Sequence, residues 1–414
     1  MNEPAEARAR AAAWLCMAVP ALFTLQAVLR FGVPVPYFDE WTYVDTLRDV
    51  TEHGLSLRAL FAFHNDHWIV IPRALMLLLD RFSGFDTRVE MVASFLVTCA
   101  TCAVLFIRYG KKPLWLVPVV SLLFCMRQFE NQLWGWQLQI YLCVFFAAAA
   151  FEVLARGRAL PGLALALCAT WSFSAGLLVW PIGLALLWPA RRKAALFGAA
   201  FALMLLAYAA NYHKPEQTPS LLFALSAPVK TLHYLLYGFG ASFGWTPGSA
   251  VGGTLVCGFC GFVAVTLWRG ERGAPSPALA LLAFGVGAVC LLALGRAGFG
   301  ADQALDGRYS TLALWVPAGI WLLLLEAAPS ARRTAALCVL GGALCIAVLD
   351  GDLTGFSAAA RGAAQRIEAA DHLLDVERRP DADLLPLMDQ PQTVRRHVPW
   401  LRERRLSLFR YVEP

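Results

Sequence analysis

The sequence has few charged residues for its length. Only 15% of its 414 residues are Asp, Glu, Lys or Arg, whereas 58% are hydrophobic, and the mean hydropathy is +0.57. Soluble domains contain about 25% charged and roughly 45–50% apolar residues, so this composition excludes an ordinary soluble domain and predicts an integral membrane protein. The net charge of +6 is modest. No basic patch with interleaved aromatic residues lies in a polar domain, which disfavours nucleic-acid binding.

Cysteine is missing from every polar loop. All eleven cysteines lie in apolar runs, including the pairs Cys99/Cys102 and Cys257/Cys260, which have no other metal-ligating residue nearby. We interpret them as small packing residues of helices, so they do not report the redox compartment. Walker-type glycine loops, coiled-coil heptads, internal repeats and a convincing signal-peptide cleavage site are also absent. The first apolar run is therefore expected to be an uncleaved anchor.

Apolar runs fill most of the first 350 residues. A membrane-spanning helix needs about 20 mostly apolar residues. Candidate spans are roughly 12–32, 89–107, 113–127, 136–155, 159–174, 175–190, 194–211, 249–268, 276–295, 309–327 and 333–350. The sequence therefore predicts an all-α polytopic membrane protein with about eleven transmembrane helices, in a range of about ten to twelve.

Basic residues in the short loops predict the orientation. Cytoplasmic loops are enriched in Lys and Arg. With the N-terminus inside, every second loop is short and basic; these loops carry Arg108, Lys111 and Lys112, then Arg156 and Arg158, Arg191, Arg192 and Lys193, Arg269 and Arg272, and Arg332 and Arg333. The alternation holds only if residues 220–244 do not cross, so we expect them to lie at the outer interface or re-enter from that side. The N-terminus is predicted to be cytoplasmic and the C-terminus to lie outside.

The predicted organisation is a transmembrane domain, residues 1–350, followed by an outer tail, residues 351–414, that is helical in part. Two outer segments belong to the membrane domain: the first loop, 33–88, and an interfacial segment, 212–248. The first loop is too long for a simple turn. Its pattern predicts amphipathic helices on the membrane surface, which would roof a cavity facing outward.

The first outer loop begins with an acidic pair, Asp39 and Glu40, flanked by Tyr37, Phe38 and Trp41. A carboxylate here suits a general base toward a hydroxyl group, or a ligand of a divalent cation. The aromatic neighbours would raise its pKa or stack on a sugar ring. The alternative is a solvated turn after a helix, with the aromatic residues in the interfacial belt.

A second polar cluster in that loop contains His64, Asn65, Asp66 and His67. Its spacing matches no known zinc site. Hydrogen bonding to a substrate or phosphate, metal ligation and capping of the following helix remain alternatives. Arg73 is expected to pair with the acidic pair or to clamp a phosphate.

Later outer loops combine aromatic, amide and basic side chains. The loop at 127–137 contains Trp134 and Gln137, which suit sugar binding, although an interfacial belt explains them equally well. Arg296 ends one span and Arg308 begins the next; arginines at such depth need a partner, either a lipid-linked phosphate or the nearby Asp302 and Asp306. Residues 171–176 are expected to line the same side. The polar clusters thus converge on one membrane face.

This arrangement resembles the GT-C superfamily of integral membrane glycosyltransferases. Within it, the chain is similar to a group of poorly characterised bacterial proteins whose pattern has four elements. They correspond here to Phe38-Asp39-Glu40-Trp41, to Asn65-Asp66-His67-Trp68 with Pro72-Arg73, to Trp134-Gly135-Trp136-Gln137, and to Gly295-Arg296 with Gly307-Arg308-Tyr309. Asp66, Trp68 and Gly307 depart from the group's Glu, Arg and Ser.

The resemblance implies transfer of a sugar from a polyprenyl-phosphate carrier to a cell-surface glycan or lipid-linked acceptor, with inversion, on the periplasmic face of a bacterial inner membrane. Asp39 or Glu40 would be the catalytic base, and a divalent cation (Mg²⁺ or Mn²⁺) at this pair is an alternative use; no other metal ligand is expected. The substrate-binding residues would be His64, Asp66, His67, Arg73, Trp134, Gln137, Arg296, Arg308 and Tyr309. The alternatives are a transporter or flippase for lipid-linked saccharides and a non-catalytic assembly subunit.

Overall fold

The computed structural model is a bundle of helices. It describes residues 3–111, 113–212, 214, 219–220, 222–271, 276–327 and 331–412. Helices account for 84% of the protein, and no strand occurs in these ranges. The predicted all-α class is therefore confirmed. Lys112, Arg272 and residues 213, 215–218 and 221 of the predicted interfacial segment lie outside the described residues, as do the side chains of Arg332 and Arg333.

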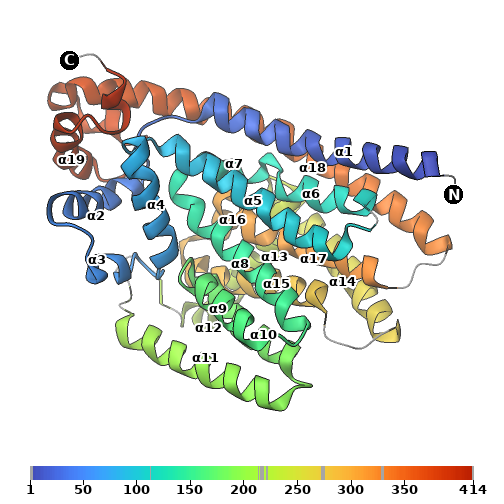
Figure 1. Cartoon of the computed structure of the whole chain (residues 1–414). Coiled ribbons are helices and arrows are strands. Elements are labelled where there is room, and N and C mark those ends of the chain that lie inside the picture. The colour runs from blue at the N-terminus through green and yellow to red at the C-terminus, as the bar shows by residue number, and fades with distance from the viewer. Residues whose placement is uncertain are drawn as a thin grey trace.

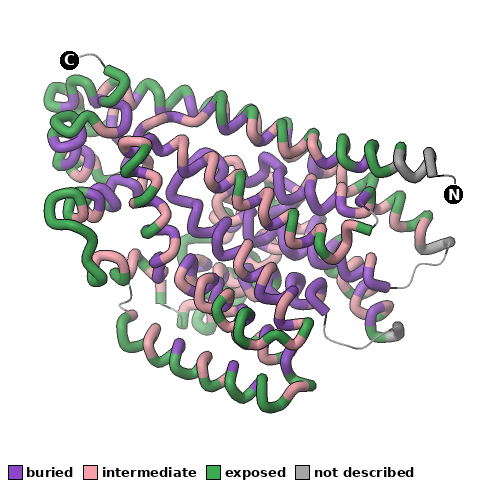
Figure 2. The backbone as a smooth tube through the Cα atoms, viewed as in Figure 1, coloured by how far each residue is buried: buried purple, intermediate pink, exposed green. Residues whose placement is uncertain are grey.

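Eight helical segments of the described chain are long and apolar enough to cross a membrane. They contain α1 (Glu3–Phe31), α5 (Thr87–Tyr109), α8 (Leu138–Ala155), α11 (Arg191–Asn211), α14 (Pro247–Glu271), α15 (Pro277–Arg296), α16 (Gly307–Ala313) with α17 (Trp315–Glu326), and α18 (Ala331–His372). Figure 2 shows that buried residues concentrate in the central helices, whereas α1, α11 and α18 are largely exposed along their outer sides. This exposed apolar surface supports a multi-pass membrane protein.

Three predicted spans are shorter in the structure than a membrane-crossing helix. They contain α6 (Val117–Leu123), α9 (Ala159–Thr170) and α10 (Val179–Leu187). The chain between α9 and α10 leaves the α-helix at Trp171 and forms a 3₁₀ turn at Ser174–Leu178. This break brings residues 173–175 to the cavity described below. The structure thus supports eight crossings by helix length, and the remaining three of the predicted eleven stay a prediction.

The segment predicted not to cross contains α12 (Phe223–Ser226) and α13 (Pro228–Gly240). At 13 residues, α13 spans only about 20 Å, less than the ~30 Å hydrocarbon core. It packs against α14 and α15, and a Cβ at Gly240 would come within 1.7 Å of the Ala250 carbonyl oxygen. Glycine therefore allows the two helix backbones to touch where α13 turns back into α14.

Four helices outside the long spans gather at one end of the bundle, which we call the loop end. These are α2 (Asp39–His53), α3 (Leu57–Phe61), α4 (Val70–Ser83) and α19 (Pro391–Glu403). Figure 1 shows that α1 begins at the opposite end of the bundle and that the C-terminal region ends at the loop end. Helices α2 and α4 fall where the sequence predicts amphipathic surface helices.

The C-terminal tail, predicted as a separate part from residue 351, packs directly against the first loop. Helix α18 runs for 42 residues without a break across the predicted boundary at 350. Its extension and α19 share a hydrophobic cluster with the first loop. The Phe38 backbone N–H donates to the Leu387 carbonyl (2.7 Å), and the Tyr411 hydroxyl donates to Asp86 Oδ2 (2.6 Å). The tail therefore forms part of the wall around the first loop.

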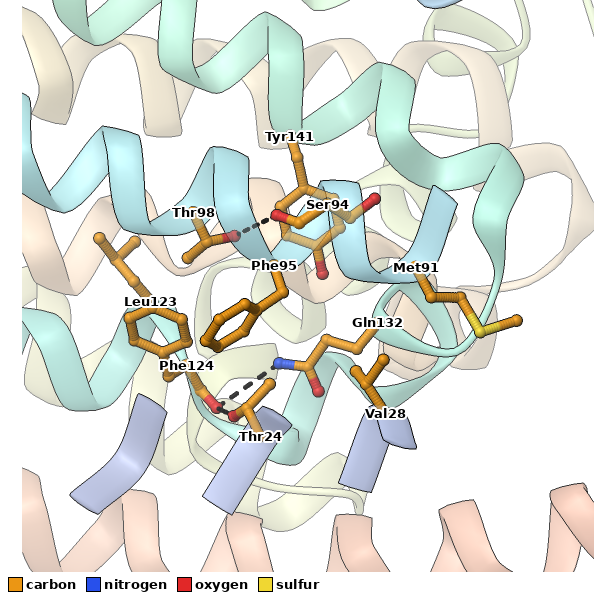
Figure 3. A pocket seen from close by; sticks show the side chains of 10 residues that line it. All are labelled: Thr24, Val28, Met91, Ser94, Phe95, Thr98, Leu123, Phe124, Gln132 and Tyr141. Atoms are coloured by element: carbon orange, nitrogen blue, oxygen red, sulfur yellow. Dashed lines mark hydrogen bonds between the residues drawn. The ribbon is translucent and has the colours of Figure 1, made fainter. Parts of the chain in front are cut away.

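A small polar cavity lies inside the bundle between α1, α5 and the chain before α8 (Figure 3). The Thr24 hydroxyl donates to the Phe124 carbonyl, and Gln132 Nε2 points to the same oxygen at 3.5 Å. Its volume of about 10 Å³ has room for about one water molecule. It is too small to hold a substrate.

Candidate functional site

A cavity of about 410 Å³, which we call the main cavity, lies at the loop end. Eight of the eleven predicted site residues line it: Asp39, Asp66, His67, Trp134, Gln137, Arg296, Arg308 and Tyr309. They come from four separate parts of the chain, so the fold brings together the polar clusters that the sequence places on one membrane face. Glu40, His64 and Arg73 are not among the lining residues.

Asp39 is the first residue of α2, and its side chain is 38% exposed toward the main cavity. The residue before it, Phe38, has φ +44° and ψ −112°, a strained conformation for an aromatic residue. The hydrogen bond from Phe38 N–H to Leu387 in the tail holds this turn. Tertiary contacts therefore fix the direction in which α2 starts and Asp39 points.

His64 is the nearest partner of Asp39: its Nε2 lies 3.6 Å from Asp39 Oδ1. Burial alone raises the pKa of Asp39, but the nearby imidazole of His64, with a smaller effect of Arg308, outweighs burial and holds the pKa below its ordinary value. This is the opposite of the direction expected from the aromatic flank. Asp39 is consequently ionised at neutral pH and ready to accept a proton.

Glu40 faces a different environment. It is only 3% exposed, and its two oxygens accept hydrogen bonds from the backbone N–H groups of Tyr37 and Trp136, both at 2.8 Å. Burial raises the pKa of Glu40 to about 8, although the two N–H donors lower it. Glu40 therefore ties the start of α2 to the chain before α8, and it does not reach the main cavity.

His64 and His67 form a tight turn in which each residue's N–H donates to the other's carbonyl, both at 2.9 Å. Asn65 occupies this turn with φ +49°, which asparagine tolerates better than most residues. His67 Nδ1 lies 2.9 Å from the Ser174 hydroxyl, and its ring packs on Phe173. Burial, aided by His64 and Arg296, lowers the pKa of His67 to about 3, so it is a neutral hydrogen-bonding group.

Asp66 is held by tyrosines of the α11 end. The Tyr212 hydroxyl donates to Asp66 Oδ1 (2.9 Å), and the Tyr208 hydroxyl donates to its backbone carbonyl (2.5 Å). Arg296 Nη2 lies 3.9 Å from Asp66 Oδ2, too far for a strong hydrogen bond. Arg296 is thus oriented across the cavity while its guanidinium keeps donors for a ligand.

Arg308 is positioned by the loop at 127–137, for which the sequence leaves sugar binding and an interfacial belt as alternatives. Glu130 accepts from the Arg308 N–H (3.1 Å), and Asn131 Nδ2 donates to the Arg308 carbonyl (2.8 Å). The Arg308 guanidinium donates to Asp306 (2.9 Å). Residues Arg127, Gln128, Asn131 and Gln132 of that loop are buried, so most of it is a polar framework inside the bundle.

The end of the same loop does reach the main cavity through Trp134 and Gln137. Trp134 Nε1 donates to the Tyr37 carbonyl (3.0 Å), which leaves the indole face as part of the wall. Tyr309 also lines the cavity, beside Arg308. Aromatic faces with nearby amide and guanidinium groups suit a ligand that has both apolar faces and hydroxyl groups.

Arg73 neither pairs with the acidic pair nor enters the main cavity. It is 3% exposed, and its Nη1 donates to the carbonyls of Leu60 (2.8 Å) and Ala62 (2.6 Å). Burial lowers the pKa of Arg73 to about 10. Arg73 therefore fastens the end of α3 and the residue after it to α4. It is not placed to bind a phosphate in the main cavity, contrary to the expectation.

The structure adds three polar side chains that the sequence analysis did not single out: Gln139, Tyr208 and Tyr212. Asn65 of the predicted polar cluster also lines the cavity, as do Phe173 and Ser174. Residues 173 and 174 belong to the loop expected on this side. The signal for Tyr208 and Tyr212 was their spacing of four residues near the end of a span, which places both on one helix face. An interfacial aromatic belt has the same pattern, so spacing alone does not identify them.

The rest of the main cavity is apolar. Its lining includes Leu291, Leu292, Leu294 and Leu312 below the two arginines. Leu291 and Leu294, both on α15, are 40% and 41% exposed. The cavity lining therefore combines polar and cationic side chains with apolar side chains of α15 and α16.

The acidic pair offers few ligands for a divalent cation. Both oxygens of Glu40 are engaged by backbone donors, which leaves Asp39 as the available carboxylate. Across the described residues, no cluster of three or more His, Cys, Asp or Glu side chains has the arrangement of a metal site. The predicted Mg²⁺ or Mn²⁺ stays a prediction.

Comparisons with models of protein families, with curated proteins and with solved structures gave no match for this chain.

Proposed function

We propose that the protein is a membrane glycosyltransferase that moves a sugar from a polyprenyl-phosphate carrier to a glycan or lipid-linked acceptor. The observation that carries this proposal is the composition of the main cavity. Two carboxylates (Asp39 and Asp66), two guanidinium groups and a group of apolar side chains share a single space. A lipid-linked sugar phosphate has the complementary parts: a sugar, an anion and a hydrocarbon chain.

In this reaction Asp39 removes the proton from the acceptor hydroxyl. The acceptor oxygen bonds to the anomeric carbon, and the bond from that carbon to the phosphate oxygen breaks. The electron pair leaves with polyprenyl phosphate, whose added negative charge Arg296 and Arg308 stabilise. Attack opposite the leaving group inverts the anomeric carbon. Trp134, Gln137 and His67 would contact the sugar.

The proposed orientation places the loop end in the periplasm of a bacterial inner membrane, with eleven crossings and a cytoplasmic N-terminus. The short basic loops carry this part of the proposal. With that orientation, the acceptor reaches Asp39 from the aqueous side, and the lipid carrier enters between helices.

Purified protein in proteoliposomes, supplied with polyprenyl-phosphate sugars labelled in the sugar, tests the function. A transferase converts the donor into polyprenyl phosphate and a labelled product when an envelope extract supplies the acceptor. A flippase moves the donor between leaflets without consuming it, and an assembly subunit does neither. Either of the last two results would overturn the proposal.

Loss of the guanidinium at position 296 should weaken donor use. We expect Arg296→Ala to raise the KM for the polyprenyl-phosphate donor about 10- to 150-fold, because a hydrogen bond to a charged group contributes roughly 1.5–3 kcal/mol. Arg296→Lys should recover part of this loss, since lysine keeps the charge but not the fork of donors. Arg58→Ala, which alters an exposed arginine of α3, is the control. An unchanged donor KM in Arg296→Ala would contradict the phosphate contact.

The pH profile should follow the lowered pKa of Asp39. A general base works when ionised, so activity is present above its pKa and is lost as the pH falls through it. We therefore expect kcat/KM to stay level between pH 5 and 7 and to decline only below about pH 4. An acid limb near pH 6.5, the ordinary range of imidazole, would assign the base to a histidine instead.

A further inference from the structure

A second cavity, of about 190 Å³, lies at the loop end beside the main cavity. The chain around α2 and the loop before α8 contribute Tyr37, Phe38, Phe129, Glu130 and Leu133, whereas the tail contributes Gly362, Gln365, Arg366, Leu385 and Pro386. It is smaller than the ~300–1,000 Å³ of pockets for drug-sized ligands. Its size suits about one sugar unit.

The two cavities meet at an aromatic contact. Tyr37 lines the second cavity and Trp134 lines the main cavity, and their rings meet edge to face with centroids 5.3 Å apart. Asp39 follows Tyr37 by two residues and faces the main cavity. A ligand in the second cavity therefore lies one aromatic layer away from the proposed base.

Polar groups are fixed around the second cavity. Arg366 is buried, donates through Nη1 to the Leu133 carbonyl (2.6 Å), and places its guanidinium 5.2 Å from the centre of the Tyr37 ring. Glu130 is held by the N–H groups of Gly307 and Arg308 at 3.3 and 3.1 Å. Gln365 is exposed and adds both an amide donor and an amide acceptor.

This lining favours a neutral saccharide. Arg366 is the one cationic side chain of this lining and its Nη1 is already engaged by the Leu133 carbonyl, so the site offers a phosphate fewer donors than the two arginines of the main cavity do. Gln365 is exposed and Leu385 is half-exposed, so the cavity is open on the tail side. Aromatic faces with a carboxylate, an amide and a guanidinium match the ring faces and hydroxyl groups of a sugar.

We infer that the second cavity is the acceptor subsite, which binds a terminal neutral sugar of the acceptor and directs a hydroxyl group past Tyr37 toward Asp39. This inference rests on the proposed transferase function. It gives the C-terminal tail a role in substrate recognition, because Gly362, Gln365 and Arg366 on α18 form one side of the subsite.

Saturation-transfer NMR on the full-length protein in nanodiscs tests the subsite with methyl glycosides of glucose, galactose, mannose, N-acetylglucosamine and rhamnose as probes. We expect at least one glycoside to bind, and Gln365→Ala and Phe129→Ala to raise its Kd roughly 2- to 10-fold each, the effect of one hydrogen bond or ring contact. Glu368→Ala, an exposed change on the same helix, should leave the Kd unchanged. Binding by none of the five glycosides, or binding that survives both cavity variants, overturns the inference.

The same variants separate this inference from the proposed function. If Gln365→Ala and Phe129→Ala leave the acceptor KM unchanged while transfer proceeds, the subsite assignment fails and the transferase assignment stands. If the glycoside binds as expected but donor is never consumed, the transferase assignment fails and a saccharide-binding site remains.

Discussion

Asp39→Asn should lower sugar transfer about 10²- to 10⁴-fold, the range that a positioned general base contributes to a reaction. The amide keeps the shape of the side chain but does not accept the acceptor's proton. Asp39 is partly exposed at the first turn of α2 and makes only a 3.6 Å contact with His64, so folding should change little. Transfer rates and unfolding temperatures of purified wild-type and variant protein, measured in parallel, give the comparison.

Asp49→Asn is the matched control, since Asp49 is an exposed carboxylate ten residues further along α2 and pairs with His53. It should keep both transfer and stability. Asp39→Asn with wild-type transfer would remove Asp39 from the reaction. If Asp39→Asn lowers transfer only in proportion to the amount of folded protein, the loss is one of stability and gives no evidence for a catalytic base.

Glu40→Ala should produce the opposite pattern, a loss of stability first. Two backbone N–H groups, those of Tyr37 and Trp136, would be left buried without an acceptor. An unsatisfied buried donor costs about 1–3 kcal/mol, so the pair costs roughly 2–6 kcal/mol. Transfer should fall as well, because the start of α2 and the chain that carries Trp134 lose their common anchor. Thermal unfolding in detergent, with transfer assayed on the folded fraction, measures both effects.

Glu40→Gln offers a graded comparison. Its single amide oxygen satisfies one of the two N–H groups, so its stability should lie between those of the wild type and Glu40→Ala. Glu403→Gln, at an exposed position of α19, should match the wild type. Wild-type stability in Glu40→Ala, together with abolished transfer, would mean that Glu40 acts in the reaction itself.

Charge and hydropathy patterns predict the class of this protein and the convergence of its polar loops. Short basic loops fix which segments share a side, and that alone groups Asp39, Trp134 and Arg296. Charge and hydropathy patterns do not predict which of Asp39 and Glu40 faces the main cavity. Adjacent residues of a helix point about 100° apart, and the strained turn at Phe38, held by Leu387 almost 350 residues away, sets which one meets the cavity.

The continuity of α18 also depends on tertiary contacts. The sequence around Gly351 and Asp352 has the composition of a helix end. In the structure Asp352 Oδ1 accepts the Met126 N–H (2.6 Å), and Gly355 allows a backbone approach in which a Cβ would lie 2.2 Å from the Met126 carbonyl oxygen. These contacts hold the helix against the loop after α6, so it continues into the tail and forms one side of the second cavity. Arg73 is a similar case, because its partners Leu60 and Ala62 are backbone carbonyls that a sequence motif does not show.

The central claim is that the protein transfers sugar from a lipid-linked donor bound in the main cavity, with Asp39 as the general base. The most direct measurement is the initial rate of transfer by wild-type, Asp39→Asn and Asp49→Asn protein reconstituted in the same liposomes with a labelled polyprenyl-phosphate sugar and an envelope extract. The structure predicts transfer by the wild type and by Asp49→Asn, with a rate at least about 100-fold lower for Asp39→Asn. Equal rates for all three proteins, or no transfer by any of them, would contradict the claim.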